Sequence, residues 1–295
     1  MDGSKSENAL PPEIIDYYAS GKELDRLAKG IGPLELARTK ELVGRFFPAP
    51  PGIVFDIGGG PGVYSCWLAR EGYEVHLVDV VPLHIEQAKR ASAAQPATPV
   101  ATLEVGDARE LAWPDACADG VLLHGPLYHL TVRKDRLAAI GESMRILRPG
   151  GVLLAIGITS HASTLVGLVN WWVHDADYFE MCRRELTEGL HVQPPNWPGL
   201  FTTAYFHRPG ELEAELEEAG LVHEITLAVQ GPGWLVPEFE KKWKDEEHRE
   251  TILRVVRLME ADTAALGTSP HLMAVARKRG SRTRRPRKLG AKRPG

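Results

Sequence analysis

The stretch from Val54 to Ser65, VFDIGGGPGVYS, constrains the fold more than any other part of the chain. An apolar run typical of a buried strand is followed by four glycines and one proline within five positions. Glycine allows the backbone to approach a ligand or another segment closely, because it carries no side chain. A glycine-rich turn between a strand and a helix is typical of the first ligand-binding loop of a parallel α/β sheet.

Strand and helix patterns alternate on both sides of this loop. Strands are predicted at residues 52–57, 74–80, 100–107, 118–125, 151–158, 222–229 and 269–277, and helices at 63–71, 83–94, 132–147, 208–220 and 238–265. This rhythm predicts a Rossmann-like α/β fold, with a seven-stranded, mostly parallel sheet and helices on both of its faces.

Three other regions depart from the rhythm. Residues 1–50 are predicted to form an N-terminal helical cap, with helices at 13–30 and 33–47. Residues 159–207 are rich in aromatic residues and prolines, which indicates a cap insertion after the fifth strand. The α/β domain is therefore expected at 51–276, followed by a disordered basic tail at 277–295.

The charge distribution separates the body of the chain from its tail. The net charge is −4, but the tail holds ten of the 35 basic residues and no acid, which leaves 25 basic against 39 acidic residues elsewhere. An acidic body disfavours a generic nucleic-acid surface, whereas the tail has the composition of a solvated polycation. Nucleic acid is thus an unfavoured partner.

Cysteine usage and hydropathy indicate a cytoplasmic location. Cys66, Cys117 and Cys182 are widely separated, which argues against a disulfide framework or a structural zinc site. The N-terminus lacks a secretory pattern, and no segment reaches the roughly 18 apolar residues of a membrane span. We therefore expect a cytoplasmic protein without a membrane segment.

The spacing of the glycines distinguishes between two kinds of nucleotide-binding loop. A dinucleotide-binding turn needs G-x-G-x-x-G/A, and neither register of this loop completes that spacing. The loop instead follows an acid with alternating glycines, namely Asp56, Gly58, Gly60 and Gly62. This arrangement resembles the first motif of class I S-adenosylmethionine-dependent methyltransferases.

Further landmarks extend the resemblance over about residues 51–277. Asp79 ends the second predicted strand, Asp107 follows the third, and the sequence LRPGG leads into the fifth. The resemblance implies S-adenosylmethionine as cofactor. It implies a binding site made of Asp56, Gly58, Gly59, Gly60, Gly62, Asp79, Val80, Asp107, Ala108 and His124, with Tyr17 and Arg38 as candidate partners of the methionine carboxylate.

The end of the fourth predicted strand, HGPLYHL, supplies the candidates for catalysis. His129 is a candidate general base and His124 a second catalytic candidate, although either histidine can equally serve structure. The Asn/Asp-Pro-Pro-Tyr/Phe motif of enzymes that methylate exocyclic amino groups is absent. No histidine or carboxylate spacing indicates a metal site, so none is expected.

Aromatic side chains indicate where an acceptor binds. The candidates are Tyr18, Tyr128, Trp171, His174 and Tyr178, and packing between cap segments is an equally good explanation for the last three.

These features favour transfer of a methyl group to an N or O atom of a small molecule. The alternatives are an RNA methyltransferase that uses the basic tail and a cofactor-binding protein without catalysis. A nicotinamide-dependent enzyme is the main alternative for the fold. The oligomeric state is not predicted.

Overall fold

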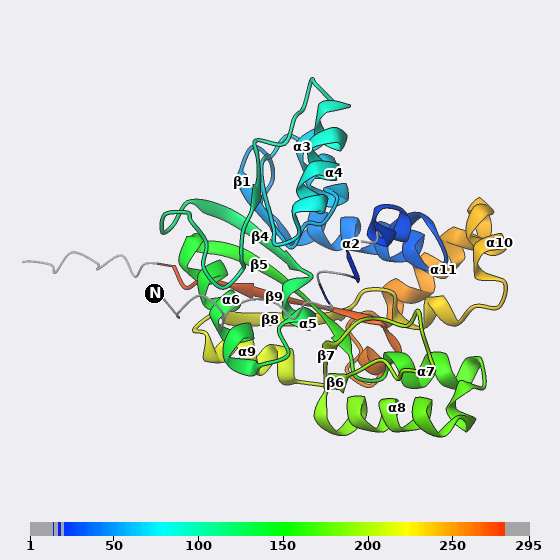
Figure 1. Cartoon of the computed structure of the whole chain (residues 1–295). Coiled ribbons are helices and arrows are strands. Elements are labelled where there is room, and N and C mark those ends of the chain that lie inside the picture. Colours follow the sequence, from blue (N-terminus) through cyan, green and yellow to red (C-terminus); the bar gives the residue numbers. More distant parts are fainter. Residues whose placement is uncertain (1–13, 15–16, 19–20, 281–295) are drawn as a thin grey trace, which may run out of the picture.

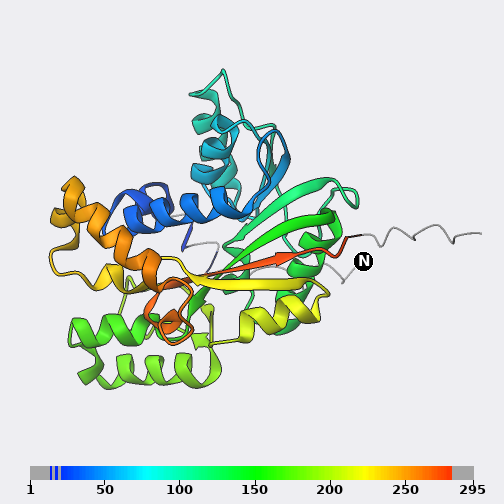
Figure 2. The same ribbon diagram turned by 180° about the vertical axis from the view of Figure 1, so that it is seen from behind.

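The structure is a computed structural model that describes residue 14, residues 17–18 and residues 21–280. Its centre is one twisted sheet with helices on both faces (Figures 1 and 2). Across the sheet the main strands follow the order β3 (Thr102–Val105), β2 (Glu74–Asp79), β1 (Ile53–Ile57), β4 (Ala118–His124), β5 (Leu147–Thr159), β9 (His271–Arg277) and β8 (Val222–Ala228). The first five are parallel and β9 is antiparallel to both of its neighbours, which confirms the predicted seven-stranded, mostly parallel fold.

Two apolar layers hold the helices to the sheet. On one face, the cluster of buried side chains contains residues of α2 (Gly32–Phe46), α3 (Val63–Arg70) and α4 (Pro82–Ala93). On the other face, it contains residues of α6 (Arg133–Ile146) and α9 (Glu211–Glu218). Because both faces are covered, β1, β4 and β5 are almost continuously apolar and buried, as is usual for the centre of a parallel sheet.

The cap insertion adds two helices and a short hairpin beyond the end of β5. It consists of α7 (Ala162–Val169), η2 (Trp172–His174), α8 (Ala176–Glu188), β6 (Leu190–His191) and β7 (Ala204–His207). β7 is parallel to the last two residues of β5, on the edge of β5 opposite to β9. The insertion therefore lies beside the carboxyl ends of the central strands, below the cap in Figure 1.

Several predicted boundaries differ in the structure. The predicted helix at 238–265 is divided into α10 (Phe239–Lys244) and α11 (Glu246–Met259), because Asp245 is extended and caps α11 through the His248 N–H. The part of the first predicted cap helix that is described contains a 3-10 helix, η1 (Lys22–Ala28), preceded by Gly21 at φ 74°. The remaining short helices are α5 (Pro126–His129), η3 (Gly231–Leu235) and η4 (Leu266–Thr268).

The predicted basic tail begins inside the sheet. Arg277 is the last residue of β9, and Lys278 exchanges backbone hydrogen bonds with Gly150 and Gly151. Residues 281–295, which carry most of the tail, lie outside the described residues, so their predicted disorder stays a prediction. Among the helices that the structure describes, none is long and apolar enough to cross a membrane.

Candidate functional site

A first cavity opens at the carboxyl ends of β1, β2 and β4, where open α/β sheets bind their ligands. It contains about 980 Å³ of non-atom space, part of it open to solvent, which is enough for a nucleoside-sized ligand. Its walls include most of the predicted cofactor-binding residues, namely Asp56, Gly58, Gly59, Gly60, Asp79, Val80, Asp107, Ala108 and His124. Gly62 lies in the same loop but does not line the cavity.

The glycines of the loop are needed for different reasons. Gly58, Gly60 and Gly62 all have positive φ, at 78°, 55° and 84°. A Cβ on Gly58 would lie 2.4 Å from both the His124 carbonyl oxygen and Pro126 Cδ, so the protein's own packing excludes a side chain there. A Cβ on Gly60 would meet only Glu23 Cγ, at 3.9 Å, and would point into open space. Only Gly60 therefore leaves room that a ligand can use.

Asp79 fixes the loop to the end of β2. Its Oδ2 accepts the Gly60 N–H at 2.9 Å, and its Oδ1 accepts the Val81 N–H at 2.8 Å. His84 Nδ1 lies 3.1 Å from the same Oδ1. Because these contacts hold a buried carboxylate at the wall of the cavity, its oxygens face any ligand that lies over Gly60.

Asp56 is fully buried at the start of the loop. Its Oδ2 accepts a 2.6 Å hydrogen bond from the Ser65 hydroxyl, and its Oδ1 is buried without a hydrogen-bond partner among the described residues. Burial raises the pKa of this carboxyl from 3.8 to about 7. Asp56 is therefore partly protonated at neutral pH in the absence of a cationic ligand.

This raised pKa predicts an unusual pH dependence of stability. Between about pH 4 and 7 the folded protein keeps a proton on Asp56 that the unfolded chain has lost, so rising pH favours unfolding. Replacing Asp56 by Asn should remove this loss, which amounts to about 2–3 kcal/mol between pH 5 and pH 8, as measured by urea unfolding at both pH values. Asp119→Asn is the opposite control. Burial raises the pKa of the Asp119 carboxyl, but the Ile53 N–H and Arg148 lower it by more, so the net pKa lies below the usual value. The Asp119→Asn variant should therefore lose stability at pH 8. Equal pH profiles for wild type and Asp56→Asn would contradict the prediction.

Asp107 lies at the cavity wall after β3 and is held by Arg109. The Arg109 guanidinium contacts Asp107 Oδ2 at 2.6 Å and also lies 3.2 Å from Asp135. Burial raises the pKa of Asp107, but the hydrogen bonds and charge of Arg109 hold it below its usual value. This carboxylate is thus ionised and fixed in place.

The cap contributes a cation that the sequence analysis missed. Arg26 is the only lysine or arginine among the described residues that line the first cavity. It donates to both oxygens of Glu35, at 2.7 and 2.8 Å, and to Glu23 at 2.6 Å. No motif in the sequence distinguishes Arg26 from the other arginines of the cap.

The two cap residues proposed for the methionine carboxylate lie elsewhere. Arg38 is fully buried in ion pairs with Glu41 and Glu260, where α2 meets the end of α11, and it does not line either cavity. Tyr17 packs edge-on against Tyr18 and Phe201 behind the cavity wall. The structure thus brings Arg26, not Arg38, to the predicted place.

The short helix α5 carries the predicted base. His129 Nε2 lies 2.7 Å from the Tyr18 hydroxyl, and its Nδ1 is buried without a partner among the described residues. Burial lowers the pKa of His129 to about 3, and it does the same for His124. Both imidazoles are therefore neutral at physiological pH, and both line the first cavity.

One cluster of side chains has the composition of a metal site. The donor atoms of Glu35, His124 and His271 lie within 4.8 Å of one another. The Glu35 carboxylate already holds Arg26 through both oxygens, and Gln230 Nε2 donates to His271 Nδ1 at 2.7 Å. These bonds engage both Glu35 oxygens and one nitrogen of His271, whereas His124 Nε2 is buried without a hydrogen-bond partner among the described residues. The cluster therefore surrounds Arg26 as a polar network with one unpaired histidine nitrogen.

A second cavity of about 820 Å³, also partly open, adjoins the first. The two cavities share Tyr18, Glu23, Arg26 and Tyr128, which we call the shared wall. The rest of the lining is mostly apolar. It comes from β5, from the insertion and from the first residue of β9, and consists of Ile158, Ala162, Ser163, Val166, Trp172, Tyr178, Met181, His191, Leu200, Phe201, Phe206 and His271.

Three of the five predicted acceptor residues line this second cavity, namely Tyr18, Tyr128 and Tyr178. Trp171 and His174 do not. Trp171 is 67% exposed and stacks on His174 at the outer surface. Trp172, the next residue, lines the cavity instead. The chain turns sharply at Trp171, where φ is 60°, so helical spacing does not continue from α7 into α8.

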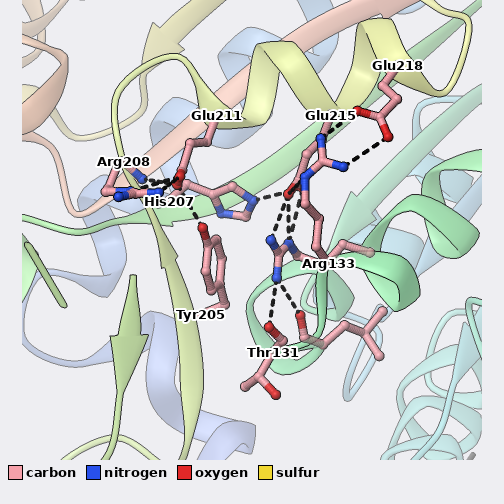
Figure 3. A network of polar contacts seen from close by, with 10 residues as sticks. Thr131, Arg133, Tyr205, His207, Arg208, Glu211, Glu215 and Glu218 are labelled. Atoms are coloured by element: carbon pink, nitrogen blue, oxygen red, sulfur yellow. Dashed lines mark hydrogen bonds and ion pairs between the residues drawn. The ribbon is translucent and has the colours of Figure 1, made fainter. Parts of the chain in front are cut away.

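A buried polar network binds the carbonyl groups that directly follow α5. Arg136 donates to the carbonyls of Leu130 and Thr131, directly after α5, at 3.1 and 3.0 Å. Its guanidinium also contacts Glu215 of α9 at 2.7 Å and lies over the Tyr205 ring of β7. Figure 3 shows the Glu215 carboxylate at the meeting point of this network. The network therefore ties α5, which carries Tyr128 and His129, to α9 and to the insertion.

Comparisons with known proteins agree with this geometry. A family model described as a methyltransferase domain matches residues 55–155. The ubiquinone/menaquinone biosynthesis C-methyltransferase UbiE of Caulobacter sp. (strain K31) is 31% identical over 120 residues, which are 38% of this chain and 46% of that protein. The chain thus spans about half the length of the curated relatives it matches.

Solved structures share the fold at low sequence identity. A SAM-dependent methyltransferase of Methanosarcina mazei has a TM-score of 0.56 at 18% identity, over 81% of this chain and 97% of that chain. The [4+2]-cyclase SpnF has a TM-score of 0.53 at 18% identity, over 82% of this chain and 81% of that chain. At such identities the likeness shows the fold alone, and the cyclase illustrates that this fold does not fix one reaction.

The sequence match covers the part of the chain that builds the first cavity. Residues 55–155 include the glycine loop, the acids that end β2 and follow β3, and the whole of β4 and α5. Over residues 55–155 the chain therefore matches the methyltransferase domain family, with the glycine loop and acids of the class I S-adenosylmethionine-dependent type.

Proposed function

We propose that the protein transfers a methyl group from S-adenosylmethionine to an N or O atom of a small molecule. The observation that carries the proposal is the shared wall: the cavity over the glycine loop adjoins a mostly apolar cavity across Tyr18, Glu23, Arg26 and Tyr128. Methyl transfer needs such an arrangement, because donor and acceptor must meet in line with water excluded.

The residues of the first cavity fit the cofactor. The open space at Gly60 and the unpartnered Asp56 oxygen leave room and an acceptor for its amino-acid end. We propose that Asp79 binds the ribose hydroxyls and that Asp107 lies near the adenine, as in the family the chain resembles. Arg26 lines this cavity and Arg38 does not; because the charge of Arg26 is already balanced by Glu35, it would contact the methionine carboxylate only through the N–H groups that Glu23 and Glu35 leave free. When bound, S-adenosylmethionine supplies an electrophilic methyl group on a sulfonium that leaves as a neutral thioether.

The chain's own residues would mainly orient the acceptor. His129 lines only the first cavity and contacts Tyr18, which faces both cavities. With a pKa near 3, His129 is a weak base, so its proposed role is to hold the Tyr18 hydroxyl at the shared wall. His124, which lines only the first cavity, stays a second candidate.

The similarity to UbiE favours a second possibility, methylation of a carbon atom, because that relative is a C-methyltransferase. The two possibilities differ in the product, since N- and O-methyl groups are distinguished from C-methyl groups by their NMR chemical shifts. A cofactor-binding protein without catalysis would release no S-adenosylhomocysteine with any acceptor.

Calorimetric titration with S-adenosylhomocysteine, with NAD in parallel, tests the proposal first. We expect micromolar binding of S-adenosylhomocysteine alone. Binding of NAD alone would overturn the cofactor assignment and require a different reaction for both cavities.

Removal of the basic tail separates a small-molecule enzyme from an RNA methyltransferase. A chain that ends at Gly280 loses seven of the tail's ten basic residues. We expect it to bind S-adenosylhomocysteine as the full chain does, because none of residues 277–280 lines either cavity. Fluorescence anisotropy with labelled single-stranded RNA at 50 and 200 mM salt measures whatever RNA affinity the tail supplies. Loss of methyl transfer to a small acceptor in the truncated chain would favour the RNA alternative.

A further inference from the structure

The lining of the second cavity divides into an apolar end and a polar end. The insertion supplies aromatic and aliphatic side chains, among them Trp172, Met181 and Phe201. The glutamate and the arginine of the lining both lie at the shared wall, next to the first cavity. A ligand that fits this lining has an apolar body and carries one polar group directed toward the cofactor cavity.

Among the described residues that line this cavity, Glu23 is the only aspartate or glutamate and Arg26 the only lysine or arginine. The charge of Arg26 is balanced by Glu35, which is buried and accepts two hydrogen bonds from the guanidinium. Glu23 uses one carboxylate oxygen for Arg26 Nε, and its other oxygen has no partner within the described part of the chain. The three groups together carry one uncompensated negative charge, and Glu23 is the carboxylate among them that lines both cavities.

The histidines of the cavity do not offset this charge. Both ring nitrogens of His191 face acceptors, Glu185 Oε1 at 2.6 Å and the Phe201 carbonyl at 2.9 Å, so any positive charge on this ring is paired with the buried Glu185. His271 Nδ1 accepts from Gln230, and burial lowers the pKa of His271, which keeps its ring neutral. The described lining therefore offers an anion no unpaired cation.

We propose, building on the proposed function, that the acceptor is an amine with an apolar body, and that Glu23 recognises its ammonium group. A carboxylate with one free oxygen attracts a cation and accepts its N–H groups, and the surrounding aromatic rings favour a cation further. Carboxylates and phosphates are disfavoured, because they would meet Glu23 without an unpaired cation to compensate it.

The transfer step balances for such an acceptor. The bound ammonium first loses one proton to water through the open side of the cavity. The nitrogen lone pair then forms the N–C bond to the methyl group while the C–S bond breaks, and its electron pair stays on sulfur. The product is the N-methylated ammonium beside a neutral thioether, and Glu23 accepts an N–H from the nitrogen before and after transfer.

Three probes with one apolar body and different charge test the proposal. Phenethylamine, 2-phenylethanol and phenylacetate are titrated by calorimetry into the full chain saturated with S-adenosylhomocysteine. We expect the amine to bind about tenfold or more tighter than phenylacetate, with the alcohol between them. Tightest binding of phenylacetate, or no amine binding at millimolar concentration, would overturn the proposal.

Two variants on η1 locate the source of the preference. Glu23→Gln should reduce the amine's advantage about tenfold and leave the alcohol's affinity within about twofold. Asp25→Asn is the matched control, since Asp25 is exposed, pairs only with Lys29 and lines neither cavity. An unchanged ranking in Glu23→Gln contradicts the proposal. So does a loss confined to S-adenosylhomocysteine affinity, which would assign Glu23 to the cofactor.

These titrations distinguish failure of the proposed acceptor class from failure of the proposed methyltransferase function. If the wild-type chain does not bind S-adenosylhomocysteine, the proposed function fails. If it binds S-adenosylhomocysteine but shows no preference for the amine, only the acceptor class is wrong.

Discussion

Replacing Gly58 by Ala should lower the affinity for S-adenosylhomocysteine by about 100-fold or more and reduce the melting temperature. The added Cβ would lie 2.4 Å from the His124 carbonyl oxygen and from Pro126 Cδ, so the loop must move away from β4 and α5. The positive φ of 78° adds a cost of about 1–2 kcal/mol for a residue with a side chain. Calorimetry and thermal unfolding measure both effects.

Two other glycines provide the controls. Gly150 also has a positive φ, 86°, but nothing lies within 4 Å of its added Cβ, so Gly150→Ala isolates the cost of backbone strain. Gly60→Ala meets nothing closer than Glu23 Cγ at 3.9 Å, so it should weaken ligand binding more than it lowers stability. If Gly58→Ala behaved like Gly150→Ala in both measurements, the close approach of this loop to β4 would be wrong.

Replacing Arg136 by Met should destabilise the fold by about 3–5 kcal/mol, because it leaves the Glu215 carboxylate buried without its main partner. For a chain of this size the melting temperature should fall on the order of 10 °C. Arg133→Ala is the surface control: Arg133 is about half exposed and pairs mainly with the exposed Glu218, so we expect a loss below about 1 kcal/mol.

A double variant separates stability from positioning. Arg136→Met combined with Glu215→Leu removes the unpaired charge and should recover most of the melting temperature. The carbonyls of Leu130 and Thr131 still lack their donor in this variant, so α5 is no longer held from behind. We expect binding at the second cavity to stay weakened even where stability returns. Full recovery of phenethylamine binding would mean that Arg136 acts through stability alone.

Most of the residues predicted for the cofactor line the first cavity, and there is a physical reason for this. Asp79 and Asp107 follow strands of a parallel sheet, and the carboxyl ends of such strands meet at one edge. The hydrophobic periodicity of the strands and the spacing of the glycines are local signals, so they identify these positions without any knowledge of tertiary packing. The same local signals explain why a seven-stranded, mostly parallel sheet was predicted correctly.

The acceptor side was less predictable because it depends on packing between distant segments. Arg26 and Arg38 lie on the same cap, and only the tertiary structure directs one toward the cavity and the other toward Glu260. Helical spacing predicted that Trp171, and not Trp172, faces the acceptor. The helix does not continue through Trp171, where φ is positive, and Trp172 lines the cavity instead. α5 is a single four-residue turn, too short to give a periodic signal.

The insertion leaves the sheet at the end of β5 and returns to it through β7, so its two ends lie beside each other. It supplies most of the second cavity and none of the lining of the first. The shape and apolar character of the second cavity are therefore encoded mainly in a segment that can be exchanged as a unit. A graft of residues 162–206 between proteins of this fold would transfer selectivity for the apolar body of an acceptor, while Glu23 and the glycine loop, which lie outside this segment, remained unchanged.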